Sequence, residues 1–484
     1  MADPASSKSV DPGATDYPKA ALPTKLFYGS GATPFGIKDA GFNYFILIYY
    51  NQVLGLDPFL AGLALAIAVL VDAVSDIAVG YFSDNWVSRL GRRHPFMYAA
   101  VLPIAISFFY LWNPPDWVNQ GQMELFVYLI VMAILVRSFL TLFEVPNAAL
   151  GPELTRHYDD RTNLMAFRYL FGWLGGLSIS VLTFMVLLPS DSAGQLGATG
   201  YQLLGMVGSG SMVIMMLLSS LGTHRHIRNL HVPPAPSAFN LSLVMQTVTS
   251  MFHNRSFVAV FISALFFGAA AGVSQAMSIY IGTFFWTLSS VEIGYIPMLG
   301  LVAVPVSFVL APRLASRWGK KEAAMRCFLF AIVFLPIAFV AELTGIFPAR
   351  DSSLYLPLLM SHYLIETTAI ICMQVVFASM NADVVEDRSA ETLGRRDEGL
   401  IFAARNFAKK AVSGLGVLLA GAILWAANFP EQAAPGEVDD ASLTALILYY
   451  LPVILGLYLA SWYSLRGYSI DRAKHLANLR KQAA

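Results

Sequence analysis

The feature that most constrains the fold of this chain is a series of long apolar runs. Each run is long enough to cross the hydrocarbon core of a bilayer as a helix, which takes about 20 residues. Only 13% of the 484 residues are charged. A backbone in lipid must satisfy its own hydrogen bonds, so such runs predict helices. We count twelve, near residues 27–51, 58–82, 95–113, 123–150, 165–189, 200–222, 256–285, 288–311, 326–345, 354–381, 399–427 and 442–465. The sequence therefore predicts an all-α membrane protein with twelve transmembrane helices.

Basic residues gather in alternate connections between these runs. The connections after the second, sixth and eighth runs and the C-terminal tail are rich in arginine and lysine. The alternate connections, such as NPPDWVNQGQ and NFPEQAAPGEVDD, carry almost none, Arg350 being the exception. Loops rich in these residues face the cytoplasm of a membrane protein. We therefore expect both termini to be cytoplasmic and the chain to lie in a plasma membrane, the inner membrane of a bacterium.

A short motif occurs twice. SRLGRR at residues 88–93 returns as SRWGKK at residues 316–321, each time after an even-numbered run. This placement predicts two pseudo-symmetric six-helix bundles related by an axis along the membrane normal. The expected organisation is a disordered cytoplasmic tail (1–25), an N-terminal bundle (26–222), a cytoplasmic linker (223–255), a C-terminal bundle (256–465) and a second cytoplasmic tail (466–484).

Two carboxylates interrupt the second apolar run. Asp72 and Asp76 are four residues apart, so they share one face of a helix. An acid at the centre of a membrane helix costs about 2.5 to 3.5 kcal/mol, and such groups usually face a cavity, a partner or a transported ion. The structural alternative is that basic side chains on other helices pair with them, and Arg137 is one candidate. A site for a coupling cation is the functional interpretation.

Other ionisable residues lie within the runs of both halves. With both signs present, these side chains can neutralise one another across a central cavity. His362 and Glu366 are four apart and could relay a proton, but a structural hydrogen bond between them is the commoner arrangement. Besides this pair, the set comprises Lys38, Asp39, Arg137, Glu144, Arg168, Arg405, Lys409 and Lys410.

Several function classes are excluded. The chain has no Walker motif, no HExxH and no GxSxG, and its formal net charge is zero. The two cysteines, Cys327 and Cys372, lie in apolar runs and are interpreted as core residues. We interpret the Tyr49–Tyr50 and Phe284–Trp286 clusters near the run ends as membrane-interface belts. We expect no enzyme, no cofactor and no nucleic-acid partner, but transport powered by an ion gradient.

Three segments together resemble one transporter family. They are VDAVSDIAVGYFSDNWVSRLGRRHPF, FEVPNAALGPELTRHYDDRTNLMAFR and ADVVEDRSAETLGRRDEGLIFAARNFAKK. They are similar to the DxxxD helix and basic loop, the fourth-loop segment and the eleventh-helix segment of the glycoside–pentoside–hexuronide:cation symporter family. This family includes melibiose permease and belongs to the major facilitator superfamily. The resemblance covers the transport core from about Asp39 to Lys410.

The resemblance implies roles for particular residues. Asp72 and Asp76 match cation-binding carboxylates, and Thr141 matches a hydroxyl at the same Na⁺ or H⁺ site. The implied substrate-binding residues are Asp39, Glu144, Arg168, Asn406 and Lys410. A cytoplasmic charge network, whose ion pairs break as the inner gate opens, would comprise Arg89, Arg92, Arg93, Glu153, Arg161, Asp383, Arg395, Arg396 and Glu398.

The resemblance leaves the substrate open. Glutamate replaces the usual aspartate at Glu144, and alanine replaces a sugar-packing tryptophan at Ala148. A sugar, glycoside or hexuronide is expected, with a lysolipid or another amphipathic or anionic solute as the alternative. A non-transporting sensor and a lipid-modifying enzyme are the competing classes, although the latter lacks a nucleophile with a base. We expect a monomer surrounded by membrane lipids.

Overall fold

The structure, a computed structural model of the whole chain, describes residues 20–86, 88–118, 121–155, 158–190, 193–227, 252, 254–392, 414–433, 436 and 438–470. The described residues form helices joined by short connections. The long helices are α4 (Pro58–Asn85), α5 (His94–Trp112), α6 (Gln122–Leu154), α7 (Tyr158–Leu182), α8 (Ala198–His224), α10 (Arg255–Tyr280), α11 (Ser290–Trp318), α12 (Lys320–Leu343), α13 (Tyr355–Thr392) and α15 (Asp440–Ser464).

Ten helices of the described part are long and apolar enough to cross a membrane. They correspond to ten of the twelve predicted spans. The first predicted span is present but broken, as α1 (Leu22–Ser30), α2 (Thr33–Ala40), the π-helix η1 (Gly41–Phe45), α3 (Ile46–Ile48) and the π-helix η2 (Tyr49–Val53). The eleventh is represented by the apolar helix Gly414–Ala426, because residues 399–413 lie outside the described part.

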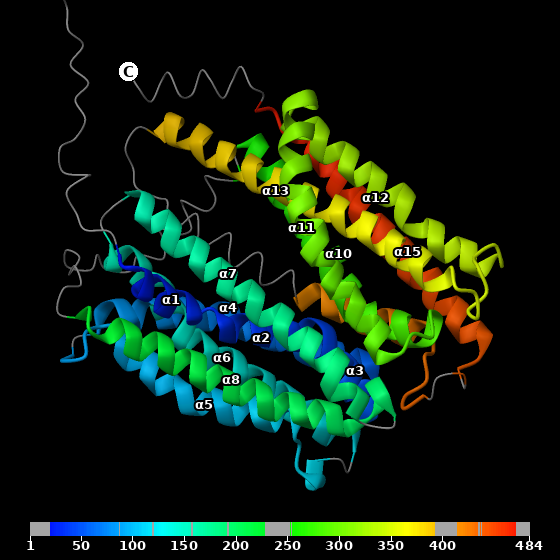
Figure 1. Cartoon of the computed structure of the whole chain (residues 1–484), viewed down its shortest axis with the longest axis horizontal. Helices are drawn as coiled ribbons and strands as arrows, with labels where there is room; N and C mark the ends of the chain where they lie inside the picture. The colour runs from blue at the N-terminus through cyan, green and yellow to red at the C-terminus, as the bar shows by residue number, and fades with distance from the viewer. Residues whose placement is uncertain are drawn as a thin grey trace, which may run out of the picture.

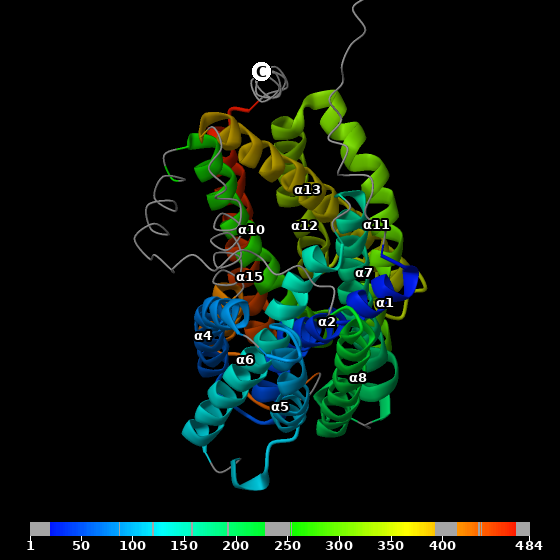
Figure 2. The same cartoon turned by 90° about the vertical axis from the view of Figure 1, so that its left-hand side faces the viewer.

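The helices form two groups, one from each half of the chain. Figure 1 shows α1 to α8 on one side and α10 to α15 on the other, and in Figure 2 α5 and α8 lie below α12 and α13. In the first group α4 packs on α6, and α5 packs on α6 and α8. In the second group α11 packs on α13, and α12 packs on α13 and α15. The packing partners are equivalent, which confirms the predicted pair of bundles.

The glycine of the repeated motif has a positive φ in both copies, although residues 88–93 form a turn and residues 316–321 join α11 directly to α12. Gly91 has φ +74° and Gly319 has φ +83°, a conformation that favours glycine and turns the chain sharply between two helices. The first and seventh transmembrane segments also end alike, in the π-helices η2 and η8 (Ile281–Phe285). The two halves therefore share local conformations as well as packing.

Hydrogen bonds between the halves gather at one end of the bundles. We call this end, which carries Tyr49–Val53 and the start of α11, the neutral end, and the end with Gly91 and Gly319 the basic end. All interhalf hydrogen bonds between described residues lie at the neutral end. We call this set of hydrogen bonds the latch. Tyr280 bonds to Asn51 and to the carbonyl of Leu47, Gln52 to the carbonyl of Pro430 and the amide of Ala433, Gln122 to Glu431, and Gln432 to the carbonyl of Val53. Gln195 bonds to Thr283, to the carbonyl of Leu288 and to Ser290.

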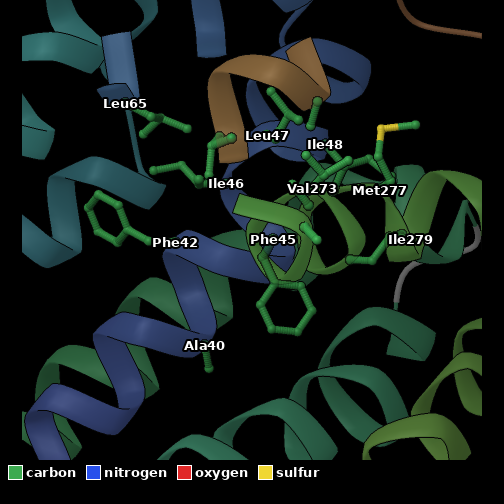
Figure 3. Close-up of a cluster of buried hydrophobic side chains, with 14 of the residues drawn as sticks. Ala40, Phe42, Phe45, Ile46, Leu47, Ile48, Leu65, Val273, Met277 and Ile279 are labelled. Carbon is green, nitrogen blue, oxygen red and sulfur yellow. The ribbon is translucent and has the colours of Figure 1, made fainter. Parts of the chain in front are cut away.

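The core extends across the halves near the latch. In Figure 3, Ile48 of the first segment lies beside Val273 and Met277 of α10, whereas Phe42 is turned away from that cluster. Tyr49, Tyr50, Phe284 and Trp286 are buried, so their interpretation as membrane-interface belts was wrong. Tyr49 and Tyr50 instead donate hydrogen bonds to the carbonyls of Trp112 and Leu111. Their phenols satisfy helix-end carbonyls inside the bundle, which sequence position alone did not reveal.

Candidate functional site

The paired carboxylates lie in the middle of an unbroken helix. Asp72 stands at the centre of α4, about thirteen residues from either end. At 1.5 Å per residue this is roughly 20 Å from each end of the helix. Asp72 is only 3% exposed, and Asp76 is half-buried one turn closer to the basic end. The predicted carboxylates therefore lie at the depth of the bilayer centre, where an ionised acid needs compensation.

Thr141 joins the two acids. Its hydroxyl lies on α6, which packs along α4, and is 2.9 Å from Asp72 Oδ1 and 2.9 Å from Asp76 Oδ1. Three oxygens from two helices thus converge on one point. A hydroxyl has one hydrogen to donate, so it can satisfy only one of the two carboxylates at a time. The structure thus brings together the three residues that the resemblance implied for a cation site, whose role stays a prediction.

A buried arginine completes this cluster. Arg137 lies one turn before Thr141 on α6, and its Nη1 is 3.3 Å from Asp72 Oδ2. The guanidinium carbon lies 4.6 Å from the centre of the Phe42 ring, and Arg137 Nε has no hydrogen-bond partner among the described residues. Asp72 therefore has a basic partner on another helix, Arg137, as the structural alternative predicted.

A second polar cluster lies one turn towards the basic end on α6. Arg168 of α7 donates from Nη2 to Glu144 Oε1 at 3.2 Å and from Nη1 to Asn147 Oδ1 at 3.2 Å. Asn147 is fully buried and donates to Ser219 of α8. The sequence singled out Glu144 and Arg168 but missed Asn147. Its position three residues after Glu144, on the same helix face, was the available signal.

Asp39 lies on the broken first segment. Its neighbour Lys38 is buried, contacts Asp39 Oδ1 at 2.6 Å and lies over the Phe35 ring at 4.6 Å. The Asp39 side chain is 43% exposed, so its carboxylate is open to a solute. The helix that carries it is pressed against α7, because a Cβ added to Gly36 would lie 1.9 Å from Gly172 O. Asp39 and Arg168 are thus held on two helices in direct backbone contact.

Part of the predicted substrate site falls outside the described residues. Asn406 and Lys410, with Arg405 and Lys409, lie in the segment 393–413, and the structure says nothing of their placement. The same holds for Arg395, Arg396 and Glu398 and for the side chain of Arg161. Their roles stay predictions from the resemblance.

Four of the nine residues predicted for the charge network, Arg92, Arg93, Glu153 and Asp383, form ion pairs at the basic end. Glu153 contacts Arg92 at 2.5 Å and Arg93 at 3.3 Å, and Arg93 also pairs with Asp84. In the second half, Lys320 contacts Asp383 at 2.6 Å. Arg89 is exposed. Each of these ion pairs joins elements of one half, so they brace the loops within a bundle and do not bridge the two bundles.

The remaining sequence candidates are core residues. Cys327 and Cys372 are buried free thiols. The His362 ring stacks on Phe334 with centroids 4.6 Å apart, and the described residues show no hydrogen bond between His362 and buried Glu366. The relay and the structural hydrogen bond are therefore both absent from this arrangement. The part of the chain that the structure describes holds no cluster of three or more His, Cys, Asp or Glu placed for a metal.

A sequence family described as MFS/sugar transport protein matches residues 27–472. The chain belongs to this family. It is thus a cation symporter of the major facilitator superfamily and not an enzyme. A symporter of Synechocystis sp. is 25% identical, with 96% of this chain and 97% of that protein covered. The putative glycoside/cation symporter YagG of Escherichia coli is 22% identical, with 89% of this chain and 88% of that protein covered.

A third relative is named for a different substrate. The sodium-dependent lysophosphatidylcholine symporter 1 of Gallus gallus is 30% identical over 31% of this chain and 28% of that protein. Among solved structures, the nucleoside transporter NupG gives a TM-score of 0.61 at 13% identity, covering 93% of this symporter and 99% of that chain. The inward-open xylose transporter XylE from E. coli gives a TM-score of 0.56 at 14% identity, covering 95% of this symporter and 97% of that chain. These likenesses establish the major facilitator fold.

Proposed function

We propose that this symporter moves a polar, sugar-like solute together with Na⁺ or H⁺ by alternating access. The observation that carries the proposal is the Thr141 hydroxyl at 2.9 Å from both Asp72 and Asp76. Two carboxylates that share one donor repel each other until a cation or proton reduces their charge. Hard oxygen ligands suit Na⁺, and either acid can instead take a proton.

The solute would bind beside this pair, on Asp39, Glu144 and Arg168. Carboxylates accept hydrogen bonds from sugar hydroxyls, and a guanidinium donates them. Glu144 and Thr141 lie three residues apart on α6, so the two sites share a helix face. A cation that lowers the negative charge near Asp76 would therefore change the field at the solute site. By linkage, the solute would raise cation affinity by the same factor.

The membrane orientation follows from the charged loops. We place the basic end and both termini in the cytoplasm, in a plasma membrane, because Lys and Arg concentrate in cytoplasmic loops. The latch then closes the outer face of the symporter. The conformation described would be inward-facing, and breaking the latch would be part of the outward transition.

Gradient-driven uptake into proteoliposomes tests the cation site. Asp72→Asn and Asp76→Asn should each abolish accumulation driven by a cation gradient, because the charge that the cation neutralises is gone. Asp116→Asn, in an exposed loop at the neutral end, is the matched control and should accumulate solute normally. Undiminished accumulation in both site variants would refute the coupling site.

An amphipathic solute is the second candidate, favoured by the partial similarity to lysophosphatidylcholine symporters. Ala148 supports it, since a side chain this small leaves no ring platform for a sugar. A thermal-shift screen separates the candidates, because a bound ligand raises apparent stability by mass action. Sugars, hexuronides and lysolipids are compared with and without Na⁺ at two pH values. Stabilisation by lysolipids alone would replace the sugar proposal.

A further inference from the structure

Arg137 has a geometry unlike that of a purely structural ion-pair partner. Structural arginine–carboxylate pairs are frequently bidentate, with N–O distances of about 2.7 to 2.9 Å. Here Nη1 approaches Asp72 Oδ2 at 3.3 Å, and Nε, although buried, has no partner among the described residues. A guanidinium held in this way leaves part of its hydrogen-bonding capacity unused at the centre of the membrane. That is costly, so the arrangement calls for an explanation other than stability.

Arg137 also contacts a second group that tolerates its charge. The Phe42 ring lies 4.6 Å from the guanidinium carbon, and an aromatic face attracts a cation electrostatically. Phe42 belongs to η1, the π-helix that starts two residues after Asp39. The side chain is therefore positioned between a carboxylate of the cation site and the segment that carries a predicted solute ligand.

We propose that Arg137 is a tethered competitor of the coupling cation at Asp72. When Na⁺ is absent, the guanidinium contributes positive charge at Asp72. When Na⁺ binds between Asp72, Asp76 and Thr141, the two cations repel each other and Arg137 moves from Asp72 towards Phe42. The inference rests on the proposed function, and it commits to Na⁺ as the competing ion.

Competition of this kind has a defined consequence for coupling. Two positive charges a few ångströms apart in a poorly screened site repel by several kcal/mol at an effective dielectric constant of about 20. Cation binding therefore displaces Arg137, and the displacement reaches η1 through the Phe42 ring. Arg137 is thus a positioning residue that transmits occupancy of the cation site to the helix of Asp39.

The test measures Na⁺ affinity without transport. Purified wild-type protein and Arg137→Gln are titrated with NaCl against choline chloride at constant ionic strength and pH 8, and thermal stabilisation is recorded. Removal of the competing charge should lower the half-saturating Na⁺ concentration by at least about tenfold, since 1.4 kcal/mol corresponds to that factor. Arg137→Lys keeps the charge and should stay within about threefold of wild type. Arg326→Gln, an exposed arginine over Trp318, is the matched control and should match wild type.

Each contrary result has a distinct meaning. If Arg137 only braces the bundle, Arg137→Gln lowers the melting temperature while the half-saturating Na⁺ concentration is unchanged or raised, and the inference is overturned. If Na⁺ stabilises neither protein, the inference is also overturned. The proposed function is then decided separately, by whether Asp72→Asn and Asp76→Asn lose gradient-driven uptake. If Arg137→Lys tightens Na⁺ binding as much as Arg137→Gln does, competition by the positive charge is likewise refuted.

Discussion

At the residue scale, the Thr141 hydroxyl is the group that contacts both carboxylates. Removing it in Thr141→Val keeps the side-chain shape but deletes a hydrogen bond to a charged group, worth about 1.5 to 3 kcal/mol. The half-saturating cation concentration for uptake should rise by about ten- to hundredfold. Uptake measured against cation concentration checks this, and Thr141→Ser, which keeps the hydroxyl, should stay close to wild type. An unchanged half-saturating cation concentration in Thr141→Val would show that the hydroxyl does not contribute to the cation site.

Residue types and spacing predicted the acids but not all of their partners. The i, i+4 spacing of Asp72 and Asp76 was sufficient to place them on one face of α4. Spacing within one helix cannot say which neighbouring helix faces them, so the contact of Arg137 with Asp72 and Phe42 required the packed structure. Asn147 was missed for the same reason, since its partners come from α7 and α8.

At the element scale, the contact between α2 and α7 allows a sharp stability prediction. A methyl group at Gly36 would overlap Gly172 O, a backbone atom that can move only with its whole helix. Overpacking of this kind costs about 1 to 3 kcal/mol. Gly36→Ala should lower the melting temperature and weaken solute binding, because Asp39 and Arg168 lie on these two helices. Gly210→Ala on α8 meets no atom within 4 Å and should leave stability unchanged or slightly raised.

The latch makes a second prediction at this scale. Tyr280 donates a 2.8 Å hydrogen bond to Asn51 across the halves, so Tyr280→Phe should weaken the closed neutral end by about 1 kcal/mol. Spin labels at exposed Trp117 and Ile346 would detect this opening, because pulsed distance measurements should then give a larger share of long label-to-label distances.

Tyr355→Phe is the matched control for the latch. Its hydroxyl donates to Trp286 O within the second half, so the interhalf distances should not change. A shift in this variant equal to that of Tyr280→Phe would mean that loss of a buried phenol, and not of an interhalf bond, opens the neutral end.

Helix number and order were predictable from apolar run length, but the internal breaks were not. The first segment contains two π-helices that hydropathy does not register, because their composition is as apolar as that of the rest of the span. This segment packs against both bundles, and such tertiary contacts cannot be deduced from composition. The repeated SRxG motif, in contrast, was a reliable signal, since both glycines adopt positive φ.

At the scale of the whole molecule, alternating access predicts a change at the basic end. Arg89 and Arg317 are exposed, one on each half, and can carry spin labels. The two labels should move closer when Na⁺ is added together with the solute that stabilises the protein in the thermal-shift screen. A label pair within one half, at Arg89 and Leu221, should keep its distance because each bundle moves as a body. Identical distances under all conditions for the first pair would contradict rocking of the halves.

The matching glycines of the two repeats have a consequence for how such a protein can diversify. The register that superimposes Gly91 on Gly319 sets Gly300 of α11 opposite Asp72, so the second repeat has no acid where the first has one. The proposed ion dependence is then inherited through one repeat alone. Mutations that accumulate in the other can alter which cargo fits while the energy source of the carrier stays the same.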